Sequence, residues 1–99
     1  NKERKKLVYK KIDDRNVSAY LRFEVIDKPG VLSNITKIFS INKVSIKRLI
    51  QNPYKSKKFS SIIVITHSSK NKFLNKIIKQ NEKKDFLIKK PKLIRIGHI

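Results

Sequence analysis

The stretch that decides the fold is residues 21–35, LRFEVIDKPGVLSNI. Apolar and polar residues alternate over positions 19–26, and this period of two is typical of a strand with one buried face. The turn residues Asp27–Gly30 follow, and apolar residues then recur at helical spacing up to about Ile41. The stretch therefore predicts a strand, a tight turn and a helix that begins directly behind the glycine.

Two further strands follow this helix and are expected to form a hairpin. The sequence VSIKRLI at 44–50 predicts the first of them, and its Lys47 and Arg48 suit an exposed edge. The second, Phe59–Thr66, contains the apolar run Ile62–Ile65. We expect this apolar strand to lie in the centre of the sheet.

A second helix and a last strand complete the pattern. Ser68 and Ser69 are expected to cap the helix before its apolar stripe begins. The stripe is formed by Phe73, Leu74, Ile77 and Ile78. Positions 86–96 then predict a strand that is interrupted at Pro91.

The order strand–helix–strand–strand–helix–strand predicts an α+β, ferredoxin-like two-layer sandwich. Each helix has one apolar face, and an antiparallel four-stranded sheet offers one matching face, so both helices are expected on the same side. The usual strand order of this fold places the first and third strands in the centre and the second and last strands at the edges, and right-handed crossovers allow little else.

Length and composition indicate one small domain. The 99 residues suffice for a single core. We expect residues 1–18 to be a charged lead-in from a missing upstream domain and residues 19–99 to be the folded domain. The absence of cysteine excludes a disulfide framework, a thiolate zinc site and a cysteine nucleophile. The longest apolar run is far too short to span a bilayer, and no signal-peptide pattern opens the chain, so we expect a cytoplasmic location.

The charge is strongly basic, with 26 Lys and Arg against 7 Asp and Glu and a formal net charge of +19. Such a balance first suggests nucleic acid as a partner. However, Lys, Ile and Asn together make up 45 of the 99 residues, which is the excess that AT-rich codons produce. The lysines are scattered over both ends, both predicted helices and the loops. We therefore expect a generally solvated basic surface and no specific nucleic-acid site.

The motif Asp27–Leu32, DKPGVL, with its flanking strand and the later Val44–Ile46, closely resembles the start of an ACT domain. Three further matches, Tyr20–Arg22, Ile50-Gln51 and Ile63–His67, are most similar to the C-terminal ACT domain of bacterial homoserine dehydrogenases. Aspartate kinases and guanosine-tetraphosphate synthetases carry ACT domains with the same loop motif.

The resemblance implies a regulatory domain that senses a small molecule, typically an amino acid. ACT domains usually work as side-by-side pairs, so a homodimer through the second strand and first helix is expected. The expected effector is threonine, for feedback control of threonine and methionine biosynthesis. The parent would be an NAD(P)-dependent dehydrogenase whose cofactor is held in the missing catalytic part, and no cofactor is expected in this chain.

The turn itself offers chemistry suited to an amino acid. Gly30 leaves no side chain in the way of a ligand, and the first amides of the helix attract a carboxylate. Asp27 could accept the ammonium group, and Asn34 could serve a hydroxyl or an amide. The predicted effector site comprises Asp27, Pro29, Gly30, Val31, Leu32 and Asn34, with Ser45, Ile46 and Gln51 from the neighbouring copy. The alternative is an ordinary strand-to-helix turn in which Asp27 is only a turn residue.

Other classes of function find less support. His67 and His98 have no evident catalytic or metal-binding partners, and a dinucleotide-binding glycine pattern is missing. The main alternative is an RNA-binding module of the same layout, which would stack bases on aromatic residues of the central strands. The first strand offers Tyr20 beside Arg22 and Glu24, and the third offers Phe59 alone. A purely structural dimerisation domain is the third possibility.

Overall fold

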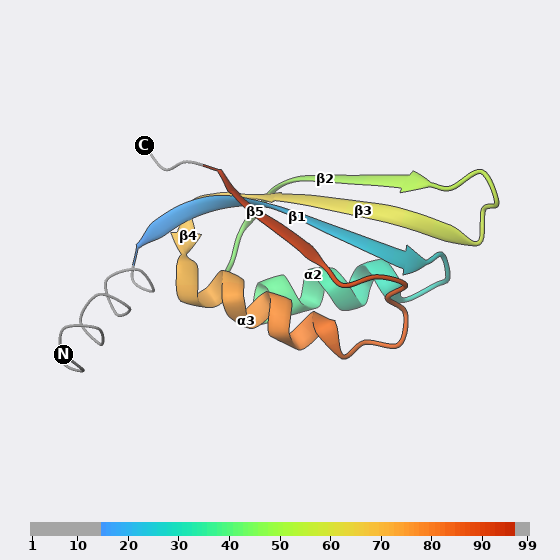
Figure 1. Cartoon of the computed structure of the whole chain (residues 1–99). Helices are drawn as coiled ribbons and strands as arrows, with labels where there is room; N and C mark the ends of the chain where they lie inside the picture. Colours follow the sequence, from blue (N-terminus) through green and yellow to red (C-terminus); the bar gives the residue numbers. More distant parts are fainter. Residues whose placement is uncertain (1–14, 97–99) are drawn as a thin grey trace.

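The structure, a computed structural model, describes residues 15–96 (Figure 1). Most of the predicted lead-in, together with His98, lies outside the described residues. The elements in chain order are β1 (Asn16–Ile26), α2 (Val31–Ile41), β2 (Ile46–Pro53), β3 (Phe59–Thr66), β4 (Ser69–Lys70), α3 (Asn71–Glu82) and β5 (Lys92–Ile96).

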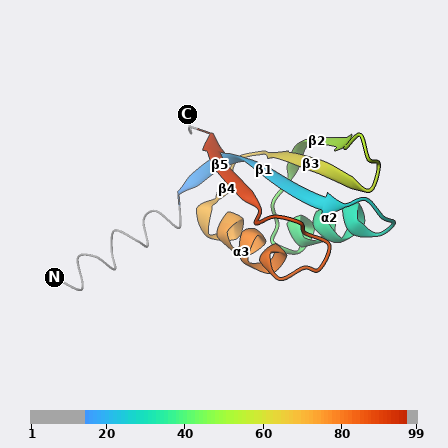
Figure 2. The same cartoon turned by 45° about the vertical axis from the view of Figure 1, so that its right-hand side comes forward.

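The sheet is antiparallel, with β3 and β1 in the centre, β2 at one edge and β5 at the other. Ile65 of β3 pairs with Tyr20, and Ser69 of β4 pairs with Val17, three residues earlier on β1. The two-residue β4 therefore continues β3 along β1. Both helices cover the same face, as the two views in Figures 1 and 2 show. The predicted ferredoxin-like sandwich and its strand order are confirmed, with β4 as an additional short strand.

The core lies between the sheet and the two helices. On β1, the side chains of Ala19, Leu21, Phe23 and Val25 are at most 1% exposed, so the alternation in the sequence marks the buried face. Phe23 meets Phe39 of α2 edge-to-face, with ring centroids 6.2 Å apart. The other face of β1 carries Tyr20, Arg22 and Glu24, and it faces away from α2 and α3.

Several boundaries differ from those predicted because contacts distant in sequence extend or replace local signals. β1 begins at Asn16 instead of Ala19, since β4 gives its first residues a pairing partner. β2 spans Ile46–Pro53 instead of 44–50. Val44 lies outside that strand and is 4% exposed, and its amide donates to the carbonyl of Phe39 at the end of α2 (3.0 Å).

The predicted serine caps of the second helix are wrong. The residue at the N-cap of α3 is Lys70, and it makes no capping hydrogen bond with its side chain. Ser69 is buried in β4 instead, where it pairs with Val17. The amide of Asn71 donates to the carbonyl of Arg15 (2.9 Å), so the helix start is fixed by the chain entering the sheet.

The closing segment is interrupted as expected. Leu87 forms an isolated bridge with Val25, and the amide of Ile88 donates to the carbonyl of Glu24 (2.9 Å). The chain leaves the sheet at this point and returns only at β5, which pairs with Ser18–Arg22. The segment between is therefore held against β1 at both of its ends.

Two lysines adopt left-handed backbone angles, Lys43 after α2 (φ 59°) and Lys57 in the turn between β2 and β3 (φ 60°). This conformation favours glycine and asparagine. Within residues 15–96, neither helix has the length and apolarity that crossing a bilayer requires.

Candidate functional site

The turn between β1 and α2 has the geometry that the motif predicts. Gly30 sits at the N-cap of α2 with a φ of 90° and a ψ of −16°, in the left-handed region. A β-carbon built on it would meet no heavy atom within 4 Å, so the space beside its backbone is open. The requirement for glycine is thus conformational. The amide of Asp27 donates to the carbonyl of Lys58 (2.8 Å) and ties the turn to the β2–β3 hairpin.

The first amides of α2 are available to a ligand. The amide of Asn34 makes the first helical hydrogen bond, to the carbonyl of Gly30 (3.0 Å), and that of Val31 makes a long one to Lys28 (3.4 Å). The amides of Leu32 and Ser33 find no acceptor within the described part of the chain. No side chain caps the helix, and its first turn carries no acidic residue. An oxyanion at this end would satisfy two free donors and the positive end of the helix dipole.

The predicted site residues fall into two groups. Asp27, Pro29, Gly30 and Asn34 are exposed at the N-terminal end of α2, whereas Val31 and Leu32 turn toward the core. Ser45 and Ile46 lie beyond the other end of this 11-residue helix, which is about 16 Å long. A single chain therefore does not bring Asp27 and Ser45 together. Gln51 is exposed near the end of β2, close to the β2–β3 hairpin that is tied to the turn at Gly30.

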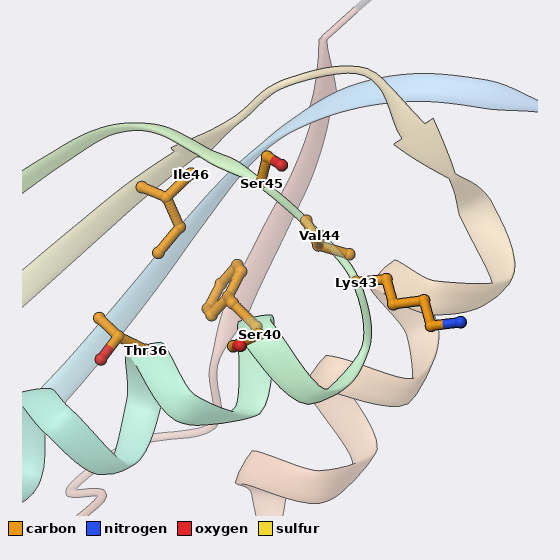
Figure 3. Close-up of a pocket in the computed structure, with 7 residues that line it drawn as sticks. Thr36, Ser40, Lys43, Val44, Ser45 and Ile46 are labelled. Carbon is orange, nitrogen blue, oxygen red and sulfur yellow. The ribbon is translucent and has the colours of Figure 1, made fainter.

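Ser45 and Ile46 line a groove of about 500 Å³ between α2 and the start of β2. In Figure 3, Thr36 of α2 and Ile46 lie on facing sides of this groove. The other lining residues are Phe39, Ser40, Lys43 and Val44. Thr36 and Ser40 were not predicted. Their spacing of four places them on one face of the helix, but that spacing alone does not distinguish a groove from ordinary surface.

A buried polar cluster lies on the face of the sheet opposite α2 and α3. The carboxylate of Glu24 accepts hydrogen bonds from Arg22 Nε (2.7 Å), Ser61 Oγ (2.6 and 2.8 Å) and the Tyr54 hydroxyl. Its side chain is only 11% exposed. Burial alone would raise the pKa of Glu24, but the hydrogen bonds from Ser61, Tyr54 and Arg22 outweigh burial and lower the pKa below its ordinary value of 4.5.

The lowered pKa predicts an acid limb in the stability of the domain. A carboxyl whose pKa is lower in the folded state stabilises the fold above its ordinary pKa, and this stabilisation is lost as the pH falls through the folded-state pKa. We expect the free energy of unfolding to decline below pH 4.5 and the Glu24→Gln variant to show a flatter acid limb. Urea denaturation between pH 7 and pH 3 measures this directly.

The matched control for this titration is Glu82→Gln, because Glu82 is exposed at the end of α3. It should keep the acid limb of the unsubstituted chain. An acid limb of unchanged slope in Glu24→Gln would show that the cluster does not lower the pKa of this carboxyl.

Other predicted alternatives find little in the structure. Tyr20 pairs with Ile65 at one end of the β1–β3 ladder and Phe59 pairs with Ile26 at the other, so these two predicted rings lie far apart on the open face. The stacking platform of an RNA-binding sheet is not assembled there. Among the described residues, no group of three or more His, Asp or Glu side chains could hold a metal ion.

Comparison with known proteins adds an independent line of evidence. Residues 21–89 match the family model described as the AHAS small subunit-like ACT domain. The homoserine dehydrogenase of Neisseria gonorrhoeae is 32% identical over 85 residues, which are 86% of this chain and 20% of that protein. The corresponding enzyme of Methylobacillus glycogenes is 37% identical over 60 residues, which are 60% of this chain and 15% of that enzyme. The chain thus spans about a fifth or less of these curated relatives.

Solved structures show the same two similarities, to homoserine dehydrogenases and to ACT domains. A homoserine dehydrogenase from Thiobacillus denitrificans superposes with a TM-score of 0.76 at 30% identity, covering 87% of this chain and 19% of that one. The ACT domain from the GTP pyrophosphokinase of Chlorobium tepidum superposes with a TM-score of 0.63, covering 83% of this chain and all of that one. At 16% identity, the second likeness concerns the fold alone.

Proposed function

Because this chain belongs to the ACT domain family, as an AHAS small subunit-like ACT domain, we propose that it is the effector-binding domain of a homoserine dehydrogenase. The observation that carries the proposal is the open turn at Gly30 with the free amides of Leu32 and Ser33 behind it. The similarity to homoserine dehydrogenases supports this choice of parent enzyme. In this proposal, the dehydrogenase reaction and its NAD(P) belong to the part of the parent outside this chain. We also propose that the parent is cytoplasmic.

The proposed effector is threonine, bound as a zwitterion. Its carboxylate would lie against the amides of Leu32 and Ser33, where two donors and the helix dipole favour negative charge. Its ammonium group would face the Asp27 carboxylate, and Asn34, one turn into the helix, would contact the hydroxyl. The negative and the positive group of the ligand would then each contact a protein group of opposite charge.

A second copy of the chain would complete this site. The C-terminal end of β2 lies beside the turn, because Pro53 pairs with Ser60 and the nearby carbonyl of Lys58 accepts a hydrogen bond from the amide of Asp27. Antiparallel pairing of two β2 edges about Ile50 would therefore carry Ser45 and Ile46 of the neighbouring copy toward this turn. Such a dimer joins the two groups of predicted residues that one chain keeps apart.

The charge on β2 does not oppose this register. With the two-fold axis at Ile50, Arg48 faces Asn52 of the other copy and Leu49 faces Gln51, so like charges are not opposed. Cross-strand partners in an antiparallel pair point to the same face of the sheet. Arg48 and Asn52 lie on one face of β2 and Leu49 and Gln51 on the other, so the partners in this register meet that condition. We therefore include the homodimer in the proposal.

Titration of the chain with threonine by calorimetry, in parallel with other common amino acids at millimolar concentration, tests the effector. The informative variant is Gly30→Asn, because asparagine tolerates a positive φ and still places a side chain over the open backbone. Valine at this position would be strained and would confuse binding with stability. We expect Gly30→Asn to weaken threonine binding about tenfold or more, since it obstructs a carboxylate held by charge-assisted hydrogen bonds.

The control for this titration is Lys79→Asn, on the exposed side of α3 and away from the turn. It should bind threonine as the unsubstituted chain does. Failure of every amino acid to bind would leave a structural dimerisation domain, and equal affinity in Gly30→Asn would place the ligand elsewhere.

A further inference from the structure

A second concave site lies on the opposite face of the sheet from the helices. It has a volume of about 350 Å³, at the small end of the range for ligand pockets. Its lining residues are Arg22, Glu24, Tyr54, Lys89, Lys90 and Lys92, and we call it the basic pocket. It is separate from the groove at α2 and from the turn at Gly30.

The backbone brings the cations of this pocket together. Arg22 of β1 and Lys92 of β5 are direct cross-strand partners, an arrangement in which like charges destabilise a sheet. The segment before β5 is fixed beside them because the amide of Ile88 donates to the carbonyl of Glu24 (2.9 Å). Lys89 and Lys90 follow directly, and Pro91 restricts the bend into β5.

The single carboxylate in the pocket does not neutralise these lysines. Glu24 is occupied by the hydrogen bonds from Arg22, Ser61 and Tyr54, and its side chain is 11% exposed. The Arg22 side chain is 46% exposed, and its Nη2 donates one long hydrogen bond, to Ser61 Oγ (3.4 Å). Within residues 15–96, the ammonium groups of the three lysines make neither an ion pair nor a hydrogen bond.

We propose that the basic pocket binds a compact ligand carrying a diphosphate or triphosphate. Four cations around one concavity concentrate a positive potential there, which lysines spread over a convex surface do not. The planar guanidinium of Arg22, held in place by Glu24, suits the geometry of a phosphate group, and the lysines supply point charges around it. A bound polyanion would also relieve the repulsion between Arg22 and Lys92.

Calorimetric titration of the 99-residue chain with inorganic pyrophosphate at 150 mM salt tests the pocket. The variant is Lys90→Gln combined with Lys92→Gln, because both side chains are exposed and neither supports the Glu24 cluster. The matched control, Lys76→Gln combined with Lys79→Gln on α3, removes the same charge elsewhere. We expect the pocket variant to bind pyrophosphate about tenfold more weakly or worse and the control to change less than about twofold.

ADP and AMP distinguish the sources of the phosphate. Binding of ADP as tight as that of pyrophosphate, with AMP much weaker, would identify the diphosphate of a nucleotide, whereas pyrophosphate alone would identify a free oligophosphate. Equal losses in the pocket and control variants, or no saturable binding at all, would overturn the proposal. The threonine titration of the pocket variant should be unchanged, so this result is independent of the effector site.

Discussion

Replacing Phe23 with alanine is expected to lower the free energy of unfolding by about 3–5 kcal/mol, the usual cost of emptying a buried phenylalanine site. Phe23 is fully buried in the centre of the sheet and packs edge-to-face on Phe39. A domain of this size is stable by only about 5–15 kcal/mol, so the variant loses much of its margin. Urea denaturation followed by circular dichroism gives the difference.

The control for this experiment is Ile41→Ala, because Ile41 is 61% exposed at the end of α2. Its removal should change the free energy of unfolding by about 0.5 kcal/mol or less. A loss below about 1.5 kcal/mol for Phe23→Ala would mean that the helices do not cover this face of β1 as described.

The Ile50→Asp variant is expected to be monomeric at concentrations where the proposed dimer of the unsubstituted chain forms. Ile50 lies on β2, the exposed edge strand, and on the proposed two-fold axis it would face its own copy. Two carboxylates would then oppose each other across the strand pair, and an apolar contact would be lost. We expect the dissociation constant to rise about 100-fold or more, measured by sedimentation velocity in salt high enough to screen the net charge.

A second variant keeps this test independent of folding. Asn52→Arg changes an exposed side chain and would place a cation opposite Arg48 of the neighbouring copy, so it should also weaken the dimer. Ile94→Asp is the control, because Ile94 is 47% exposed on β5 at the opposite edge of the sheet. Unchanged association in both β2 variants would exclude this register.

Local patterns predicted much of the fold because they reflect one element at a time. The alternation over 19–26 and the helical spacing behind Gly30 each report which face is buried, and the structure confirms both. Segment ends were less predictable. Asn16 joins β1 and Ser69 leaves the role of cap only because β4 pairs with the start of β1, a contact between residues more than fifty positions apart.

The candidate sites also differ in how far local sequence predicts them. The motif around Gly30 predicted a tight turn that leads directly into a helix, and the structure shows this turn with Gly30 in the left-handed region. The amides of Leu32 and Ser33 behind it have no acceptor within the described part of the chain. In the sequence, Glu24 is one polar residue of an alternating strand. It becomes buried because Tyr54 and Ser61, 30 and 37 residues away, converge on its carboxylate. No local signal predicts such a cluster or the cross-strand pair of Arg22 and Lys92.

The left-handed lysines reveal a reserve of conformational stability. Lys43 and Lys57 hold backbone angles that cost a side-chain-bearing residue about 1 kcal/mol relative to glycine. Both lysines are exposed, and the fold tolerates the strain at these two positions. The core offsets this local cost, and the domain could be stabilised at Lys57 without a change to any residue that lines the groove beside α2 or the basic pocket.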